Sequence, residues 1–206
     1  MADTPQSIEK VLSRRIHGWG RGTVFTPTDF LDLGSRGAVD ISLHRLTKQG
    51  VIRRIARGLY QFPQKHPLLG EVAPSIDAVA KAISDSEQVK LQPSGAYAAN
   101  LLGLSEQVPA RVVFFTSGRA RKVRLGKMVI ELRPTTPRNV AAAGRPSGLV
   151  IAALRHLGRD HITDDRISHL QNILSKVDRM RLLKDLACAP AWLHPYLRSI
   201  AAGKQK

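Results

Sequence analysis

The stretch from residue 34 to residue 63 constrains the fold most strongly, because its hydrophobic period changes halfway along. Ser35 is a good N-cap for a helix, and Gly50 stands where a left-handed residue would end it. A helix is therefore predicted from about Arg36 to Gln49. When its residues are placed at roughly 100° intervals, the core-facing side is apolar and consists of Val39, Leu43 and Leu46.

The opposite side of this helix mixes arginine, lysine, histidine and small residues. Such a composition suits a helix that lies in the major groove of DNA, where arginine reads guanine edges and lysine holds phosphate. We therefore expect the helix to bind DNA. Its candidate DNA contacts are Ser35, Arg36, Gly37, Asp40, Ser42, His44, Arg45 and Lys48.

Beyond Gly50 the apolar residues alternate with arginines, as they do in a strand with one buried face. Arg57 and Gly58 supply a turn, because glycine tolerates a positive φ without steric cost. The pattern predicts a two-stranded hairpin, closed by Pro63, with apolar residues on one face and arginines on the other. The candidate DNA contacts on this hairpin are Arg53, Arg54 and Arg57.

Three further elements are predicted before this stretch. Residues Ser7–His17 form an amphipathic helix, residues 24–25 form a short strand, and another helix starts at Thr26 with Pro27 in its first position. Helix, strand, helix, turn, helix and hairpin is the order of a winged helix-turn-helix. Two other interpretations stay open: a solvated basic helix followed by a surface hairpin, and a winged helix used for protein contacts.

Prolines interrupt residues 64–74, so the sequence predicts a domain boundary in this stretch. The winged helix-turn-helix domain would span residues 1–66, and a mixed α+β domain would span residues 67–206. The second domain is expected to have a small antiparallel sheet and a helical last third, which makes the whole chain α+β. The strands expected in the antiparallel meander are residues 111–116, 121–125 and 128–132.

A second cluster of basic residues accompanies the predicted meander. Ser94 begins a helix of small residues, where free backbone N–H groups can bind an anion, although plain helix capping explains this serine equally well. A solvated sheet face is likewise an alternative explanation for the charges on the strands. The candidate secondary site for an anion or a partner comprises Ser94, Arg119, Arg121, Lys122, Arg124 and Lys127.

The 206-residue chain has a net charge of +16, of which +6 falls in residues 1–66 and +10 in the remainder. A surplus of this size predicts a nucleic-acid or acidic-protein partner. The single cysteine, Cys188, excludes internal disulfides and cysteine-rich zinc sites, and it fits a reducing cytoplasm. No apolar run approaches about 18 residues, and the first ten residues are polar, so we expect neither a membrane span nor export.

The sequence lacks familiar catalytic patterns. Its seven histidines form no HExxH pair, no GxSxG motif occurs, and no GxxxxGK[ST] motif follows the glycines at residues 18–22. Aromatic residues make up 5% of the chain, which is few for the stacking platform of a single-strand RNA binder. We therefore expect no enzymatic activity, no metal and no cofactor.

Three segments carry a resemblance to a known family. They are VIRRIARGLYQFP at residues 51–63, QPSGAYAANLLGLSEQVPARVVFFTSGRARKV at residues 92–123, and APAWLHPYL at residues 189–197. In this order and spacing they resemble the AbiEi-like antitoxins of type IV abortive-infection systems, in the DUF6088 subgroup. The resemblance covers nearly the whole chain.

This resemblance implies an N-terminal winged helix that represses its own operon and a C-terminal domain that opposes a nucleotidyltransferase-like toxin. Arg36, Arg45 and the hairpin arginines would contact the operator, and no catalytic residues carry over. We therefore expect a cytoplasmic, autoregulating repressor and antitoxin. Its partners would be double-stranded operator DNA and the toxin, and it would act as a monomer or a DNA-assisted dimer. The alternative is a protein-interaction module that binds an acidic partner without specific DNA recognition.

Overall fold

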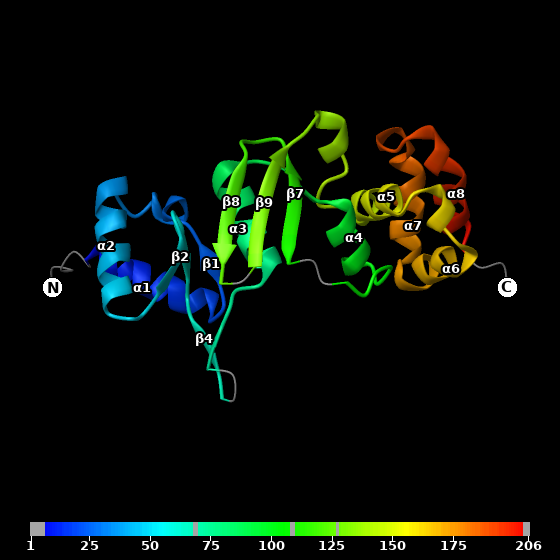
Figure 1. The fold of residues 1–206 in the computed structure, drawn as a ribbon. Helices are drawn as coiled ribbons and strands as arrows, with labels where there is room; N and C mark the ends of the chain where they lie inside the picture. The colour runs from blue at the N-terminus through cyan, green and yellow to red at the C-terminus, as the bar shows by residue number, and fades with distance from the viewer. Residues whose placement is uncertain (1–6, 68–69, 108–109, 127, 204–206) are drawn as a thin grey trace. The chain divides into compact units, whose positions relative to one another are not determined.

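The computed structural model describes residues 7–67, 70–107, 110–126 and 128–203, and the fold is α+β, as predicted (Figure 1). The residues group into two compact units. The first holds Met1–Gln88 together with Val123–Lys127, and the second holds Val89–Lys122 together with Met128–Lys206. The chain therefore leaves the first unit, returns to it for a short passage and leaves it again.

The N-terminal elements follow the predicted order. They are α1 (Ile8–Trp19), β1 (Val24–Phe25), the 3-10 turn η1 (Pro27–Phe30), α2 (Arg36–Lys48), β2 (Arg53–Ala56) and β3 (Leu59–Gln61). β3 lies between β1 and β2 in an antiparallel sheet. η1 begins where a helix was predicted, because the backbone N–H and the hydroxyl of Thr26 both donate to the Asp29 carboxylate. It is a single 3-10 turn instead of an α-helix.

One hydrophobic core joins α1, α2 and this sheet. Leu12 and Ile16 of α1 and Leu43 of α2 are fully buried. Phe25 and Phe30 meet edge to face with ring centroids 5.5 Å apart, a geometry that stabilises aromatic pairs beyond their burial alone. Packing in this core fixes one side of α2 and leaves the other side facing outward.

The stretch 64–74, predicted to be irregular, forms a second hairpin in which β4 (Gln64–His66) pairs antiparallel with β5 (Gly70–Val72). α3 (Ile76–Glu87) follows and contacts β1. The first compact unit therefore extends to Gln88, whereas the predicted boundary lay at residue 66. The prolines in this stretch separate short elements that belong to one unit.

A four-stranded sheet comes next, in the order β6-β7-β9-β8. Its strands are β6 (Leu91–Pro93), β7 (Arg111–Thr116), β8 (Arg121–Leu125) and β9 (Met128–Pro134). β6 pairs antiparallel with β7, but β7 and β9 pair in parallel. The predicted antiparallel meander is therefore wrong, because β9 and not β8 lies beside β7.

The composition of the strands explains this order. Val112 of β7 and Ile130 of β9 are fully buried, whereas β8 exposes Lys122 and Arg124. Apolar strands gain most from a central position, and charged side chains suit the edge of a sheet. β8 accordingly takes the outer position, and the sheet is mixed.

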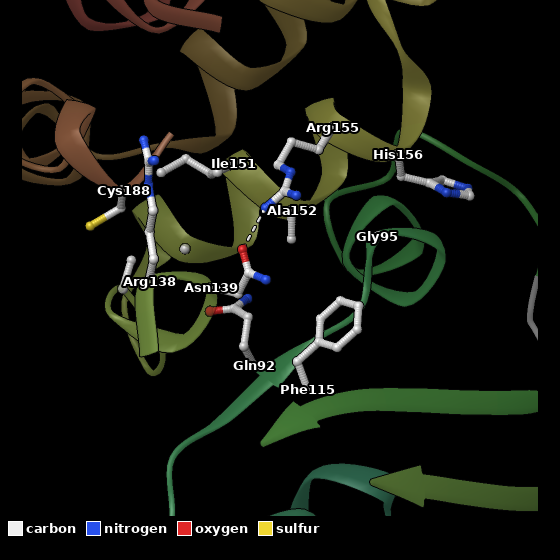
Figure 2. A pocket seen from close by; sticks show the side chains of 12 residues that line it. Gln92, Gly95, Phe115, Arg138, Asn139, Ile151, Ala152, Arg155, His156 and Cys188 are labelled. Atoms are coloured by element: carbon white, nitrogen blue, oxygen red, sulfur yellow. Dashed lines mark hydrogen bonds between the residues drawn. The ribbon is translucent and has the colours of Figure 1, made fainter. Parts of the chain in front are cut away.

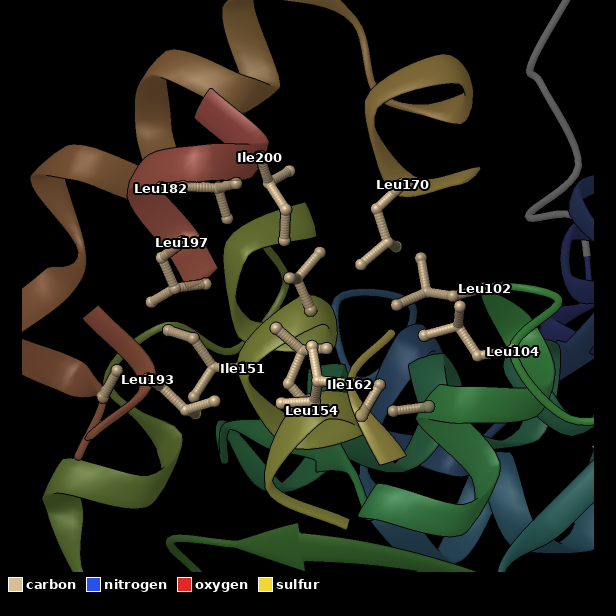
Figure 3. Packing of buried hydrophobic residues seen from close by; sticks show 14 of the residues in the cluster. Leu102, Leu104, Ile151, Leu154, Ile162, Leu170, Leu182, Leu193, Leu197 and Ile200 are labelled. Atoms are coloured by element: carbon tan, nitrogen blue, oxygen red, sulfur yellow. The ribbon is translucent and has the colours of Figure 1, made fainter. Parts of the chain in front are cut away.

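The last third is helical, as predicted, and α5 lies at its centre. The helices of the second unit are α4 (Gly95–Leu101), α5 (Pro146–Leu157), α6 (Asp164–Ile173), α7 (Lys176–Lys184) and α8 (His194–Ala202), with 3-10 turns η2 (Pro137–Val140), η3 (Arg159–His161), η4 (Leu186–Cys188) and η5 (Ala191–Leu193). Figure 3 shows Ile151 and Leu154 of α5 among leucines from the surrounding helices. The close packing of α5 against α4 requires a glycine at position 95, because a Cβ there would lie 2.3 Å from the Cβ of His156.

Candidate nucleic-acid interface

α2 has the bounds that its caps dictate. The Ser35 hydroxyl accepts from the Ala38 N–H at 3.4 Å, and the helix ends at Lys48, one residue before the predicted end. Val39, Leu43 and Leu46 are buried in the core, as predicted. An α-helix with its side chains is about 10 to 12 Å across, and a major groove about 12 Å wide admits it. The 13 residues of α2 span about 20 Å at a rise of about 1.5 Å each.

The outward face of α2 carries most of the predicted contacts. The predicted contacts that are exposed are Ser35, Arg36, Gly37, Asp40, His44, Arg45 and Lys48. Ser42 does not belong to this face: it is 6% exposed, and its hydroxyl donates to the Ala38 carbonyl at 2.9 Å. Ser42 lies three residues after Val39 and four before Leu46, so helical spacing places it on the core-facing side.

Two carboxylates lie beside the arginines of this face. The Arg36 Nε lies 2.9 and 3.0 Å from the two carboxylate oxygens of Asp40, and the Arg45 Nη1 lies 3.6 Å from a carboxylate oxygen of Glu9. Both arginine side chains are more than half exposed. Exposed ion pairs contribute only about 0 to 1 kcal/mol, so a phosphate group can replace either carboxylate at small cost.

The hairpin divides its arginines between two faces, which corrects the prediction for Arg53. The Arg53 Nη2 donates to the Gln61 Oε1 at 2.6 Å, and its Nη1 donates to the Glu71 Oε2 at 2.8 Å. Arg53 thus ties β2 to β3 and to β5. Successive side chains of a strand point to opposite faces, so Arg53 and Arg54 cannot both point outward.

Arg54 and Arg57 are exposed, and Arg57 precedes the turn residue Gly58, whose φ is 71°, as the glycine was predicted to allow. Six exposed basic residues from α2 and this hairpin thus remain as candidate contacts. We call them the α2–hairpin set: Arg36, His44, Arg45, Lys48, Arg54 and Arg57.

One exposed residue of α2 was not among the predicted contacts. Ile41 is 56% exposed, with Gly37 one turn before it and His44 and Arg45 one turn after it. In a major groove, an apolar side chain at such a position can contact the methyl group of thymine. Helical spacing alone places Ile41 on this face, so the signal was present in the sequence.

The secondary cluster is divided in the structure. The backbone N–H of Ser94 donates to the Val113 carbonyl at 2.8 Å, and its side chain forms no capping hydrogen bond. Arg119, Lys122 and Arg124 are exposed, whereas Arg121 is half-buried, and Lys127 lies outside the described residues. Lys122 and Arg124 share one face of β8, and Arg121 lies on the other. The structure therefore does not bring this predicted set together.

Comparison with known families gives a match over most of the chain. The model of DUF6088, a family of unknown function, matches residues 8–182. The chain belongs to the DUF6088 family. The crystal structure of the RV2827C protein from Mycobacterium tuberculosis matches at 16% sequence identity, covering 97% of this chain and 81% of that chain, with a TM-score of 0.38. No curated protein matches the chain.

In this DUF6088 protein, Arg15 of α1 is already paired. Its Nη1 and Nη2 donate to the two carboxylate oxygens of Asp32 at 2.8 and 2.7 Å. Hydrogen bonding from Arg15 lowers the pKa of Asp32 below its usual value, and the same contact raises the pKa of Arg15. Arg15 therefore links α1 to the segment that precedes α2.

Within the described residues of this DUF6088 protein, no helix is both long and apolar enough to cross a membrane. α5, for example, has 12 residues, whereas a spanning helix needs about 20.

Proposed function

We propose that this DUF6088 protein is a sequence-specific DNA-binding repressor in which α2 enters the major groove. The observation that carries the proposal is the division of α2 into two sides: Val39, Leu43 and Leu46 are buried, and the outward side is exposed and basic. Exposed arginine and lysine supply affinity through phosphate contacts, and arginine supplies selectivity at guanine edges.

The order of α1, β1, η1, α2, β2 and β3 supports the interpretation of the first unit as a winged helix-turn-helix. In that interpretation, the β2–β3 hairpin is the wing, and Arg54 and Arg57 contact the DNA backbone or the minor groove. Arg45 is the proposed base-reading residue, because its side chain is 65% exposed and its weak partner Glu9 lies 3.6 Å away.

We further propose that the protein represses its own operon and acts as antitoxin to a nucleotidyltransferase-like toxin. This part rests on the resemblance to AbiEi-like antitoxins. An antitoxin that contacts its toxin needs a protein-binding surface, and large apolar side chains are exposed at the end of α6 and along α7. They are Ile173, Val177, Met180 and Leu183. Exposed apolar residues that lie close together are typical of protein contact sites.

The test of the DNA-binding role is a fluorescence-anisotropy titration at two salt concentrations. It compares the DNA upstream of this protein's own coding region with a random duplex. A preference for the upstream DNA that survives the higher salt would support specific recognition. If both duplexes bind equally and the binding disappears at higher salt, the basic surface alone explains the binding, and the proposal of specific recognition is refuted.

Two variants separate base contacts from phosphate contacts. Arg45→Ala should lower affinity for the upstream DNA by about 1 to 3 kcal/mol and relax its specificity. Arg57→Ala should weaken binding to both duplexes alike, and it should reduce the slope of log affinity against log salt concentration by about 1. Lys81→Ala is the matched control, because Lys81 is exposed in the same unit and belongs to α3 instead of α2 or the hairpin. Equal losses on both duplexes for Arg45→Ala would contradict its base-reading role.

A further inference from the structure

The second unit contains a cavity of about 250 Å³ along one side of α5. Five α5 residues spaced at helical intervals line it: Gly148, Ile151, Ala152, Arg155 and His156. Figure 2 shows Gln92 of β6 and Phe115 of β7 lining it from the sheet, and Arg138 and Asn139 lining it from η2. We call this space the α5 cavity. Its lining comes from the second compact unit alone.

Two guanidinium groups of the α5 cavity are held by neutral acceptors. The Arg155 Nη1 donates to the Asn139 Oδ1 at 3.0 Å, and the Arg138 Nη2 donates to the Ala189 carbonyl at 3.2 Å. Asn139 is itself fixed, because its Nδ2 donates to the Thr135 Oγ1 at 2.8 Å. A chain of hydrogen bonds thus orients Arg155 without neutralising its charge.

The absence of a carboxylate sets these arginines apart. No Asp or Glu lines the α5 cavity in the part of the chain that the structure describes, and neither Arg138 nor Arg155 forms an ion pair there. By contrast, Arg53 and Arg145 are paired with Glu71 and Asp185. Charged guanidinium groups that are oriented but not neutralised are suited to bind a carboxylate or a phosphate.

The apolar lining residues indicate what the body of a ligand is, apart from its anionic group. Phe115, Ile151 and Ala152 provide apolar surface, which suits a ring or a short hydrocarbon body. The cavity volume of about 250 Å³ lies just below the usual range of about 300 to 1,000 Å³ for ligand pockets, so a small ligand is favoured. A ligand with a single ring fits this volume, whereas a polymer does not.

We propose that the α5 cavity binds a small organic anion, a carboxylate or a phosphate monoester whose body is no larger than one ring. Arg155 contacts the anionic group, Arg138 adds positive charge, and Asn139 positions Arg155. The ring lies against Phe115 and Ile151. This site is separate from the proposed DNA contacts of the first unit, and either proposal can fail without the other.

Cys188 gives a direct readout of occupancy. It lines the cavity and is the one cysteine of the chain, so alkylation by the neutral reagent iodoacetamide reports on this site alone. The probe is phenyl phosphate, which combines a ring with an anion, and inorganic phosphate and phenol are its separate parts. At about twice its Kd, phenyl phosphate should slow alkylation about threefold, because only the unoccupied fraction reacts. Phosphate or phenol alone should protect less.

Isothermal titration calorimetry of the full chain at constant ionic strength then assigns the contacts. Arg155→Gln should weaken phenyl phosphate binding about tenfold or more, because a charge-assisted hydrogen bond is lost. Arg155→Lys should recover part of the affinity, and Arg198→Gln on α8 is the matched control, since Arg198 is exposed and does not line the cavity.

Three results would overturn the proposal. The first is that none of the probes, benzoate included, gives heat or protects Cys188. The second is that Arg198→Gln loses as much affinity as Arg155→Gln. The third is that benzoate and phenyl phosphate both bind no better than phenol, which would show that the anionic group makes no contact. If benzoate binds and phenyl phosphate does not, the ligand class narrows to carboxylates; the reverse narrows it to phosphate monoesters.

Discussion

The α2–hairpin set and the α5 cavity both present arginines, but they hold them differently. On α2, Arg36 and Arg45 lie beside the carboxylates of Asp40 and Glu9. Arg155 and Arg138 are also exposed residues, but at the cavity they lie against an amide oxygen and a backbone carbonyl. Each arginine on α2 can leave its carboxylate and bind one phosphate of a long polyanion instead. A pair of oriented and unneutralised guanidinium groups in a small cavity suits one small anion.

The two arrangements should therefore respond differently to salt. Binding that releases several counterions from a polyanion weakens steeply as salt rises, whereas a single anion in a partly apolar cavity changes much less. The following predictions test the packing and the ion pairs of the two regions through folding stability, first where packing decides and then where charges decide. The chain has two tryptophans, with Trp19 in the first unit and Trp192 in the second. Unfolding of each unit can thus be followed in a Trp192→Phe or Trp19→Phe background.

The largest effect is expected at the tight wall of the α5 cavity. A Cβ on Gly148 would lie 2.3 Å from the Ala142 carbonyl oxygen and 2.5 Å from the Gln92 Oε1. Gly148→Ala should therefore destabilise the second unit by about 3 kcal/mol, at the upper end of overpacking costs. Urea denaturation followed by Trp192 fluorescence measures this. An unchanged urea midpoint would contradict the tight packing around Gly148.

The next effect separates the two hairpin arginines. Arg53→Ala should destabilise the first unit by about 2 kcal/mol, because it leaves the buried amide oxygen of Gln61 without its donor. Gln61 is 1% exposed. Arg54→Ala, one residue away and exposed, should change stability by less than about 0.5 kcal/mol. Trp19 fluorescence in urea measures both, and equal effects would contradict the division between the two faces.

A smaller effect of opposite sign is expected at Gly37. A Cβ at this position meets no atom within 4 Å, and Gly37 is exposed within α2. Gly37→Ala should therefore stabilise the first unit by about 0.5 to 1 kcal/mol through helix propensity. Thermal unfolding measures the gain. A loss of stability would mean that the outward face of α2 is not open at this position.

The smallest effect concerns Arg15, a half-buried arginine that a carboxylate does neutralise. The pKa of Asp32 is lowered by hydrogen bonding from Arg15, so the folded state binds this proton less readily than the unfolded state does. The stability from this pair is present above the unfolded-state pKa and is lost as pH falls through the lowered folded-state pKa. Asp32→Asn should therefore lower Tm slightly near neutral pH and leave it unchanged in strong acid. A difference in Tm that persists in acid would point to another cause.

Local signals predicted the elements that carry the proposed DNA contacts. Ser35 fixed the start of α2, Gly58 fixed the hairpin turn, and the spacing of Val39, Leu43 and Leu46 fixed the buried side. These features depend on residues within one or two turns of each other, so spacing along the chain was enough to find them. The α+β fold class and the helical last third followed in the same way.

Features that depend on distant residues escaped prediction. Strand alternation alone separates Arg53 from Arg54, but the pairing of Arg53 with Glu71 depends on β5, which was not predicted as a strand. β9 lies beside β7 because partners in a sheet are chosen by burial and not by order along the chain. The α5 cavity joins residues from β6 to η4, and no local spacing connects Gln92 with Cys188.

The short passage Val123–Lys127 affects how this protein can be divided. It clusters with the first unit although both neighbouring segments of the chain cluster with the second. A fragment that stops at Gln88 is thus an incomplete first unit, and a fragment that starts at Val89 carries residues of the other unit. Neither unit can therefore be isolated as one continuous segment of the chain.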